Sequence, residues 1–521
     1  MSTTELEVKL EIGSEGARRL PGKTALRAMR LGQPAQKILQ STYYDTPAHR
    51  LRDEAASLRV RWDGKDWVQT LKYGTKVEHG LSNPVEFECV LDGPELQVER
   101  INDPAVEQWL SDILSEGPLA PVFETEIDRH THLLRCKDIG TVELAIDRGE
   151  VKDPRRSTAI NEVELELKSG LPFALLTIAE QLFDGERISA ATASKAERGY
   201  ALSRQPSRDL DAPKAHSKPD LQPDQAAANA FKAIGRSAAG QVLNNLNLLK
   251  YSDDPEVPHQ LRVGLRRLRA CMRVFRSFLT SDELRRLAHD ARDLGRVVGN
   301  LRDADVLLID IAVPAVEALG NKGKHQATLD YLAGNQADQR RLVRESTASE
   351  RWTFLKLNCM LFEQAVDRAF LNAEKPPADE TVMSVARREL ERTWQHVLKK
   401  GRGFADHAIE ERHEMRKMLK TMRYASEYFL QLYPGEKTEA FTADLKRLQN
   451  AFGYLNDLAM AEALQQKITV KKPDDTRLRR SVATILGWHQ ERAEKAMRKA
   501  DQRWHSLCEG REFWRIKTVS G

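Results

Sequence analysis

The chain of 521 residues has few cysteines, few aromatic residues and no long apolar run. Its five cysteines are scattered, odd in number and without the spacing of a metal site or a disulfide framework, which favours a reducing compartment. No stretch of about 18 apolar residues occurs, so we expect no membrane-spanning helix. The N-terminus is acidic and does not read as an export signal. Together these absences predict a cytoplasmic protein without membrane contact.

The sequence also lacks an excess of charge of one sign. It has 81 basic and 77 acidic residues, a net charge of +4, so any site for a polyanion must arise from local clustering. Aromatic residues make up only 6% of the chain, and none are interleaved with the arginines as a stacking platform for nucleic-acid bases. Nucleic acid is therefore the partner that we rank last. The length predicts two or three domains, because a domain usually has about 100 to 200 residues.

Two regions with different periodicity follow each other along the chain. Residues 1–203 contain short runs in which apolar and charged residues alternate, which is typical of antiparallel strands, with helical segments between them. Residues 204–224 are rich in Pro, Asp and Ser and are predicted to be a linker. Residues 225–515 have long helical periodicity. We therefore predict an α+β multidomain protein with an N-terminal β domain and a C-terminal all-α domain.

The first run, ELEVKLEI, places Glu5, Glu7 and Lys9 on one face of a strand and apolar residues on the other. One such strand would usually be an edge with a solvated face. Here the alternation recurs in Arg59 and Arg61 and again in residues 162–166. If the sheet closes, these charged faces line an interior.

A wall of mixed charge suits a polyphosphate substrate. Basic side chains neutralise phosphoryl oxygens, and clustered carboxylates hold Mg²⁺ or Mn²⁺, which bridges those oxygens and activates water. Lys9 among glutamates fits such a site, although a structural ladder of ion pairs explains it equally well.

The order of these motifs resembles the CYTH family of triphosphate tunnel metalloenzymes. The motifs are Glu5-x-Glu7-x-Lys9, Tyr44-Asp45-Thr46, Leu58-Arg59-Val60-Arg61, Thr70-Leu71-Lys72, Glu162 to Glu166, and Ser194 to Tyr200. The resemblance covers nearly all of the first 200 residues. It implies an eight-stranded antiparallel barrel whose interior is the active site.

The resemblance also assigns roles to residues of this chain. Substrate phosphates would contact Lys9, Arg59, Arg61, Lys72, Arg129 and Lys195. Metal would be bound by Glu5 and Glu7 together with two of Glu162, Glu164 and Glu166, whose even spacing leaves the choice open, with Asp147 and Glu143 assisting. Glu7, Lys9, Arg59 and Arg61 are the expected catalytic residues.

The helical region contains an internal repeat. The segment HQLRVGLRRLRACMRVF from His259 recurs as HEMRKMLKTMRYASEYF from His413, an offset of 413 − 259 = 154 residues. In each copy the basic residues form one stripe of a helix, opposite an apolar face. Each stripe alone could be a solvated face. Their duplication predicts that the stripes face each other or a common groove, where a polyanion would relieve their repulsion.

This repeat resembles the CHAD family, named for a conserved histidine α-helical domain. The resemblance implies two four-helix halves that bind inorganic polyphosphate, which would allow association with polyphosphate granules. The contacts it carries over are His259, Arg262, Arg266 and Arg269 in the first copy and His413, Arg416, Lys420 and Arg423 in the second. No carboxylate or cysteine cluster supports metal binding by the two histidines.

Three functions remain open from the sequence. The first is metal-dependent hydrolysis of inorganic triphosphate, with the helical domain binding polyphosphate. The second is cyclisation of ATP to cyclic AMP in the same barrel, as in class IV-type adenylate cyclases. The third is a non-catalytic polyphosphate-binding protein. The sequence selects neither a chain length, nor Mg²⁺ over Mn²⁺, nor an oligomeric state.

Overall fold

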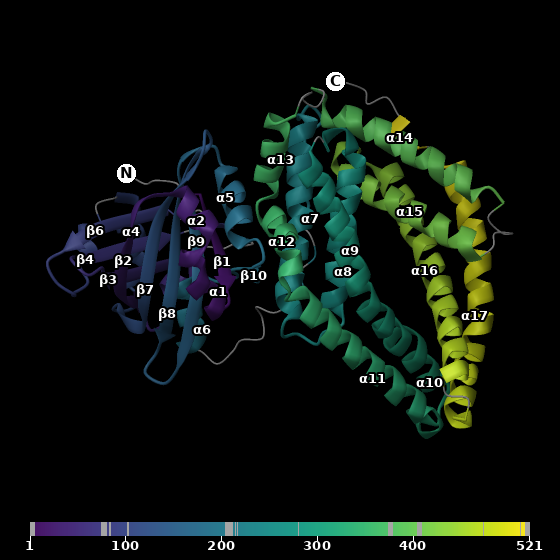
Figure 1. Cartoon of the computed structure of the whole chain (residues 1–521). Helices are drawn as coiled ribbons and strands as arrows, with labels where there is room; N and C mark the ends of the chain where they lie inside the picture. The colour runs from purple at the N-terminus through teal and green to yellow at the C-terminus, as the bar shows by residue number, and fades with distance from the viewer. Residues whose placement is uncertain are drawn as a thin grey trace. The chain divides into compact units, whose positions relative to one another are not determined.

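The computed structural model describes all residues except 1–5, 74–80, 83–84, 102–103, 204–211, 214, 216, 280, 374–378, 404–408, 472–473, 511 and 516–521. Packing divides the chain into two compact units (Figure 1). The sheet unit contains residues 1–214, 246–252 and 348–368, and the helical unit contains residues 215–245, 253–347 and 369–521. The described residues of the predicted linker, 204–224, form no helix or strand.

One mostly antiparallel sheet forms the centre of the sheet unit. Its strands are β1 (Glu7–Ile12), β2 (Arg30–Asp45), β3 (Ala56–Trp62), β4 (Trp67–Tyr73), β5 (Leu81–Ser82), β6 (Val85–Leu91), β7 (Ala120–Cys136), β8 (Gly140–Lys152), β9 (Ser157–Gly170) and β10 (Ile188–Ala190). Neighbouring strands follow the order β10-β1-β9-β8-β7-β2-β3-β4-β6, and β5 pairs with β1. The predicted antiparallel β domain with flanking helices is confirmed.

The predicted closure of the sheet into an eight-stranded barrel is wrong in detail. Eight strands have six or more residues, but the short strands β5 and β10 bring the total in the described part of the chain to ten. The second edge of β1 is shared by these two, since β10 pairs with Leu10 to Ile12 and β5 with Glu7 and Val8. No ladder between the described residues joins β6 to β1, because that edge is already occupied.

Helices cover the outer, apolar face of the sheet. Helices α1 (Ser14–Arg19), α2 (Thr24–Met29) and α5 (Ala174–Phe183) pack against β7, β8 and β9 (Figure 1). Val8 and Leu10 of β1 are fully buried, as are Leu144 and Leu165 of the neighbouring strands. The alternation in the sequence therefore turns the apolar side of β1 toward the hydrophobic core under the helices. Its charged side faces the interior that the sheet encloses.

One end of the interior is filled by helix α6 (Lys195–Ser203). Its Tyr200 packs with Tyr43, Phe123 and Ile127, and its hydroxyl donates a 2.8 Å hydrogen bond to Asp45. Asp45 is buried and also accepts from three backbone amides at residues 46, 51 and 52. The Tyr44-Asp45-Thr46 motif is thus a structural junction that fixes this end. The remaining small helices of the unit are α3 (Arg50–Asp53) and α4 (Pro104–Leu114).

The C-terminal region is helical, as predicted. Its helices are α7 (Ala227–Leu249), α8 (Glu256–Val274), α9 (Asp282–Asp305), α10 (Val313–Leu319), α11 (Lys322–Thr347), α12 (Thr353–Met360), α13 (Phe362–Leu371), α14 (Val382–Gly401), α15 (Ile409–Phe429), α16 (Glu436–Lys471) and α17 (Thr476–Glu509). A π-helical segment, Val306–Ala312, follows α9. No described helix is both long and apolar enough to cross a membrane.

The sequence repeat becomes a repeat of helix pairs in the helical unit. Helix α8 packs on α9, and α15 packs on α16, so each copy is a basic helix followed by a partner helix. Helices α8 and α15 also contact each other. The division into two four-helix halves stays a prediction.

Candidate functional site

The charged face of the sheet encloses a cavity of about 280 Å³. This is near the lower end of the usual range for small-ligand pockets and suits a compact ligand. It is lined by Glu7, Lys9, Tyr43, Ser57, Arg59, Arg61, Thr70, Lys72, Glu86, Glu88, Arg129, Glu164, Glu166, Ser194, Lys195 and Ala196. All six basic residues expected to contact phosphate lie in this one cavity.

Lys9 lies directly opposite Glu164 in the antiparallel ladder of β1 and β9. Its ammonium is 3.0 Å from Glu164 and 3.1 Å from Glu7. Burial alone would lower the pKa of Lys9, but the carboxylates of Glu164 and Glu7 outweigh it and raise that pKa. Lys9 is therefore a permanently charged cation in this wall.

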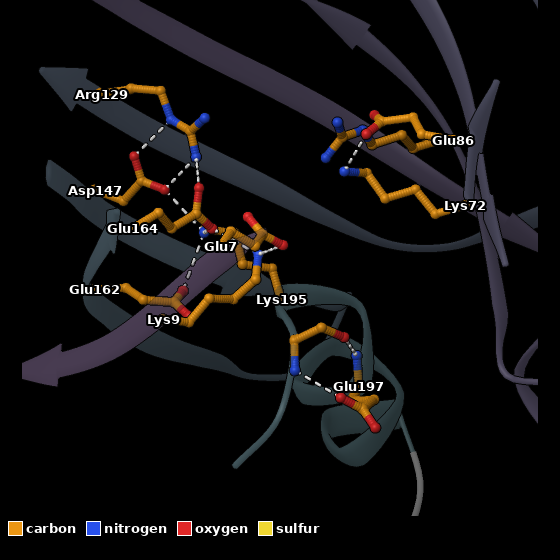
Figure 2. A network of polar contacts seen from close by, with 12 residues as sticks. Glu7, Lys9, Lys72, Glu86, Arg129, Asp147, Glu162, Glu164, Lys195 and Glu197 are labelled. Atoms are coloured by element: carbon orange, nitrogen blue, oxygen red, sulfur yellow. Dashed lines mark hydrogen bonds and ion pairs between the residues drawn. The ribbon is translucent and has the colours of Figure 1, made fainter. Parts of the chain in front are cut away.

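Arg129 and Lys195 complete a compact network around Glu164 (Figure 2). Arg129 binds Asp147 through two nitrogens, at 2.7 and 2.6 Å, and reaches Glu164 at 2.6 Å. Lys195 lies 2.8 Å from Asp147, 3.0 Å from Glu162 and 2.9 Å from Glu164. Because several carboxylates surround each cation, the pKa of both Arg129 and Lys195 is raised despite burial.

A capping box fixes the backbone of Lys195. The side chain of Ser194 accepts from the Glu197 amide at 3.1 Å, and the Glu197 carboxylate accepts from the Ser194 amide at 2.6 Å (Figure 2). This reciprocal pair satisfies two amides at the start of α6. Lys195, the first residue of the helix, is thereby held beside the acidic network.

Arg59 and Arg61 form the part of the cavity that has no close ion pair. No described carboxylate lies within ion-pair distance of either guanidinium, and Arg59 donates a hydrogen bond to the Tyr43 hydroxyl at 3.4 Å. Burial, Arg59 and Arg129 lower the pKa of Arg61 to about 9. Burial raises the pKa of Tyr43, but Arg59 and Arg61 outweigh it and lower that pKa. Burial lowers the pKa of Arg59, but Tyr43, Glu86 and Glu88 outweigh it and raise that pKa. The positive potential is therefore strongest at Arg61.

The wall formed by β4 and β6 carries a separate ion pair. Lys72 lies 2.7 Å from Glu86, across the cavity from the Glu164 network in Figure 2. Thr70 donates a 3.0 Å hydrogen bond to Glu88 on the same pair of strands. Both carboxylates line the cavity.

Only some of the expected metal ligands line the cavity. Glu7 and Glu166 are opposite each other in the β1–β9 ladder, and both line the cavity together with Glu164. Glu162 does not line it: its carboxylate is fully buried beneath Lys195. Asp147 is equally buried, and Glu143 lies 3.9 Å from Lys168 outside the cavity lining. Glu5 lies outside the described residues.

The carboxylates that face the cavity fit a hard cation. Mg²⁺ and Mn²⁺ prefer oxygen ligands, and Glu7, Glu164 and Glu166 supply them on two adjacent strands. No group of three described His, Cys, Asp or Glu side chains already has metal-binding geometry, since these carboxylates point toward cations. Glu7, Glu164 and Glu166 are the residues that would hold such an ion.

The sequence analysis assigned no role in the site to three polar cavity residues, Tyr43, Glu88 and Thr70. Tyr43 is opposite Arg59 in the β2–β3 ladder, and Glu88 is opposite Thr70 in the β4–β6 ladder. Glu86 and Glu88 alternate around Phe87, which was a usable signal. Tyr43 offered none, because its place depends on strand register.

The predicted polyphosphate contacts form a cation cluster on helices α8 and α15. The pKa of Lys420 is lowered to about 6 by burial and by the charges of Arg266, Arg416 and Arg262. Arg266 in turn has a lowered pKa because of burial, although Tyr424 opposes it, and because Arg262 and Arg423 are near. The two stripes are thus close enough to repel each other. Arg269 lies among Arg273, Arg292 and Arg296, which together with burial lower its pKa.

The two copies of the repeat place an aspartate near the corresponding arginine. Arg262 is bound to Asp303 at 2.9 Å. Burial lowers the pKa of Arg416, and Asp457, which lies 154 residues after Asp303, opposes that shift. A glycine faces the guanidinium in each copy: an added Cβ would be 3.5 Å from Arg262 at Gly299 and 3.9 Å from Arg416 at Gly453. The glycines leave room for the arginines.

The two histidines are less defined than the arginines. The pKa of His259 is lowered by burial and by Arg302, so it is mostly neutral. His413 lies in α15, and its side chain is outside the described residues. Arg423 lies 3.3 Å from Glu427 and is partly neutralised.

An antiparallel sheet around a phosphate-sized charged cavity, followed by duplicated basic helices, defines a two-domain class of protein. Residues 3–200 match the model of the CYTH domain, and residues 233–466 match the model of the CHAD domain. The chain therefore contains a CYTH domain followed by a CHAD domain, as its motifs predicted.

Two relatives illustrate the match. The inorganic triphosphatase of Haemophilus influenzae is 31% identical over 198 residues, which are 38% of this chain and 54% of that protein. The chain thus spans about half the length of this curated relative. The crystal structure of the CHAD domain from the plant Ricinus communis is similar with a TM-score of 0.50 and 25% identity, covering 58% of this chain and 99% of that one.

Proposed function

We propose that the CYTH cavity hydrolyses inorganic triphosphate with a divalent cation. The observation that carries this proposal is the pair Arg59 and Arg61, two guanidinium groups with no described carboxylate within ion-pair distance, in the same small cavity as the carboxylates of Glu7, Glu164 and Glu166. A buried cation without counter-charge is costly unless a ligand supplies the charge. The similarity to the Haemophilus influenzae inorganic triphosphatase supports the same substrate class.

The residues divide the work between them. Arg59 and Arg61 bind phosphoryl oxygens, because guanidinium groups match their planar, multidentate hydrogen bonding. Lys9, Arg129 and Lys195 exchange part of their contact with Glu164 for substrate oxygens, and Lys72 does the same with Glu86. These cations orient the chain of phosphates and stabilise charge that develops on the leaving phosphate.

A bound Mg²⁺ or Mn²⁺ would neutralise phosphoryl oxygens and lower the pKa of water at the reacting phosphorus. Glu7 and Glu166, with Glu164, are the described residues that would hold it. Their negative charge also prevents a phosphate from binding flat against that wall without a cation. The substrate is thereby directed with its phosphates toward Arg59 and Arg61.

We further propose that the CHAD domain binds inorganic polyphosphate along the cation cluster of α8 and α15. Support comes from the mutual repulsion of Arg262, Arg266 and Lys420, which a flexible polyanion would relieve. A role in recruiting substrate and a role in localising the protein are both compatible with this surface.

The cavity favours a phosphate chain over a nucleotide. Tyr43 is its one aromatic lining residue among those described, and its ring is already stacked on Phe123, with the ring centroids 4.5 Å apart, which disfavours stacking on a base. Formation of cyclic AMP from ATP would nevertheless decide for cyclase activity. Polyphosphate binding with no turnover of any substrate would indicate a non-catalytic binding protein.

The decisive experiment is a phosphate-release assay on the full chain. Triphosphate, thiamine triphosphate, ATP and long polyphosphate are compared with Mg²⁺ and with Mn²⁺. We expect triphosphate to be cleaved fastest and Lys9→Met to lower its kcat/KM by roughly 100-fold or more, as for the loss of one electrostatic contact to a transition state. Lys37→Met is the matched control, because Lys37 is half exposed and pairs with Asp63 away from the cavity. Equal activity of the two variants would refute the site.

A further inference from the structure

Strand β10 is a short strand at the edge of the sheet. It pairs with β1 and is followed by helix α6, whose first residue is Lys195. The pairing involves Leu10, Glu11 and Ile12 of β1, and the next amide, at Ala191, donates to the carbonyl of Lys9 at 3.0 Å. Lys195 follows Ala190 after 195 − 190 = 5 residues. The position of this strand therefore controls two of the cations in the cavity. A strand of three residues at a sheet edge has little stability of its own.

The outer edge of β10 is covered by side chains from two segments that lie far along the chain. The carbonyl of Glu186 accepts from Thr353 at 2.5 Å, that of Ile188 from Lys356 at 2.9 Å, and that of Ala190 from Asn247 at 3.3 Å. These carbonyls are two residues apart, as expected for one edge of a strand. Both donor segments, residues 246–252 and 348–368, belong to the sheet unit.

The donors are built into the structure, since Asn247, Thr353 and Lys356 are each more than nine-tenths buried. The ammonium of Lys356 has no carboxylate within ion-pair distance among the described residues, and its hydrogen bond goes to the backbone of Ile188. A buried cation that is not neutralised costs stability. The presence of Lys356 here therefore indicates that its hydrogen bond to Ile188 has a function. Burial and the nearby Lys250 lower the pKa of Lys356 to about 8.

We propose that Asn247, Thr353 and Lys356 are positioning residues of the triphosphatase site, which hold β10 against β1 and so fix Lys9 and Lys195. None of them lines the cavity, so they act through the backbone. The expected effect on activity rests on the proposed hydrolysis of triphosphate. The expected effect on the position of β10 rests on the hydrogen bonds alone. It makes residues from the helical part of the sequence necessary for a site formed by the first 200 residues.

The test uses the full chain and the variants Lys356→Met and Thr353→Val, which keep side-chain bulk but remove the donor. Thr177→Val is the control, because it also removes a hydroxyl-to-carbonyl bond in the sheet unit, to Phe173 at the start of α5, together with a 3.4 Å hydrogen bond from Arg368. Amide hydrogen exchange is measured for residues 186–195, and triphosphate hydrolysis is measured in parallel.

We expect exchange at the Ala191 amide to rise by about tenfold or more in both variants and to stay unchanged in the control. We expect kcat to fall by about 10- to 100-fold with KM changed less than about threefold, because small displacements of a catalytic group affect mainly the transition state. Unchanged exchange at Ala191 would overturn the proposal. So would faster exchange with full activity. If the wild-type chain does not cleave triphosphate, the proposed function fails, while the exchange result still decides whether these residues hold β10.

Discussion

Lys9 and Glu164 are directly opposite in the β1–β9 ladder, and their side chains are joined at 3.0 Å. Glu164 also contacts Lys195 at 2.9 Å and Arg129 at 2.6 Å, so one carboxylate contacts three cations from three different elements. Burial would raise the pKa of Glu164, but Lys195, Lys9 and Arg129 hold it well below its usual range. Without substrate, the cavity is stabilised through this residue.

Glu164→Gln should therefore destabilise the protein strongly. Removing one partner of a buried ion pair typically costs about 3–5 kcal/mol, and here three cations each lose one of their carboxylate partners. A carboxylate with a depressed pKa stabilises the fold above its unfolded pKa, and this contribution is lost as pH falls through the folded value. The difference in free energy of unfolding between wild type and variant should shrink below about pH 4.

Denaturant titrations from pH 3 to 8 measure this difference. Glu126→Gln is the control, since that carboxylate is half exposed and its ion pair with Lys152 is long, at 3.6 Å. A loss of stability in Glu164→Gln no larger than in the control would contradict the role of Glu164.

Arg61 and Arg129 should respond oppositely to removal of their charge. Arg61→Met deletes a buried cation that no described carboxylate neutralises, so the ligand-free protein should gain about 1–3 kcal/mol. Arg129→Met leaves the buried Asp147 with Lys195 as its remaining partner and should cost about 3–5 kcal/mol. Both variants should lose triphosphatase activity.

Thermal unfolding without and with triphosphate distinguishes the two effects. The Tm of Arg61→Met should exceed that of wild type without ligand and rise less when triphosphate is added. A lower Tm for Arg61→Met in ligand-free protein would mean that its charge is already compensated.

Variants of Glu166 and Glu162 should have different effects, the first on metal binding and the second on stability. Glu166 lines the cavity opposite Glu7, whereas Glu162 is buried beneath Lys195. We expect Glu166→Gln to raise the Mn²⁺ concentration for half-maximal activity by roughly tenfold or more with little change in stability. Glu162→Gln should mainly lower the free energy of unfolding.

Metal titrations of activity and of Tm provide the readouts. A Tm that rises with Mn²⁺ in wild type and in Glu162→Gln, but not in Glu166→Gln, is the expected pattern. The reverse pattern would assign the ion to Glu162.

Polyphosphate binding should be linked to protonation of Lys420. Burial, Arg266 and Arg416 lower its pKa to about 6, so it is largely neutral at pH 7.5. A bound polyanion favours the charged form, which raises that pKa, so binding takes up a proton and the affinity increases as pH falls from about 9 to 6. Since Lys420 is charged in the unfolded chain and neutral in the folded one between these pKa values, the free energy of unfolding falls as pH falls from about 10 to about 6.

Calorimetry in buffers of different ionisation enthalpy counts the protons taken up. Lys420→Met should bind more weakly below pH 6 and lose up to one proton of uptake. Lys417→Met serves as control, since Lys417 is half exposed and paired with Glu414. Equal uptake in all three proteins would exclude Lys420 as the titrating group.

Much of this protein could be predicted from local sequence. The alternation in ELEVKLEI determined which side of β1 is buried, because successive side chains of a strand point to opposite faces. The order of the short motifs, ending with Ser194 to Tyr200, indicated the CYTH resemblance that the family model confirms. The 154-residue offset of the repeat relates Arg262 to Arg416 in the sequence alone. These features depend on residues near each other in the chain, or on a comparison of the chain with itself.

Tertiary structure decided the rest, because it depends on strand register and on contacts between distant segments. The sequence could not choose among Glu162, Glu164 and Glu166, since they share one face; only their depth in the sheet separates the cavity wall from the buried support. It could not show that Arg61 lacks a carboxylate partner while Arg129 has two. Nor could it show that Asn247, Thr353 and Lys356 complete the edge of β10, because backbone carbonyls carry no sequence signal and the donors are 57 to 168 residues away.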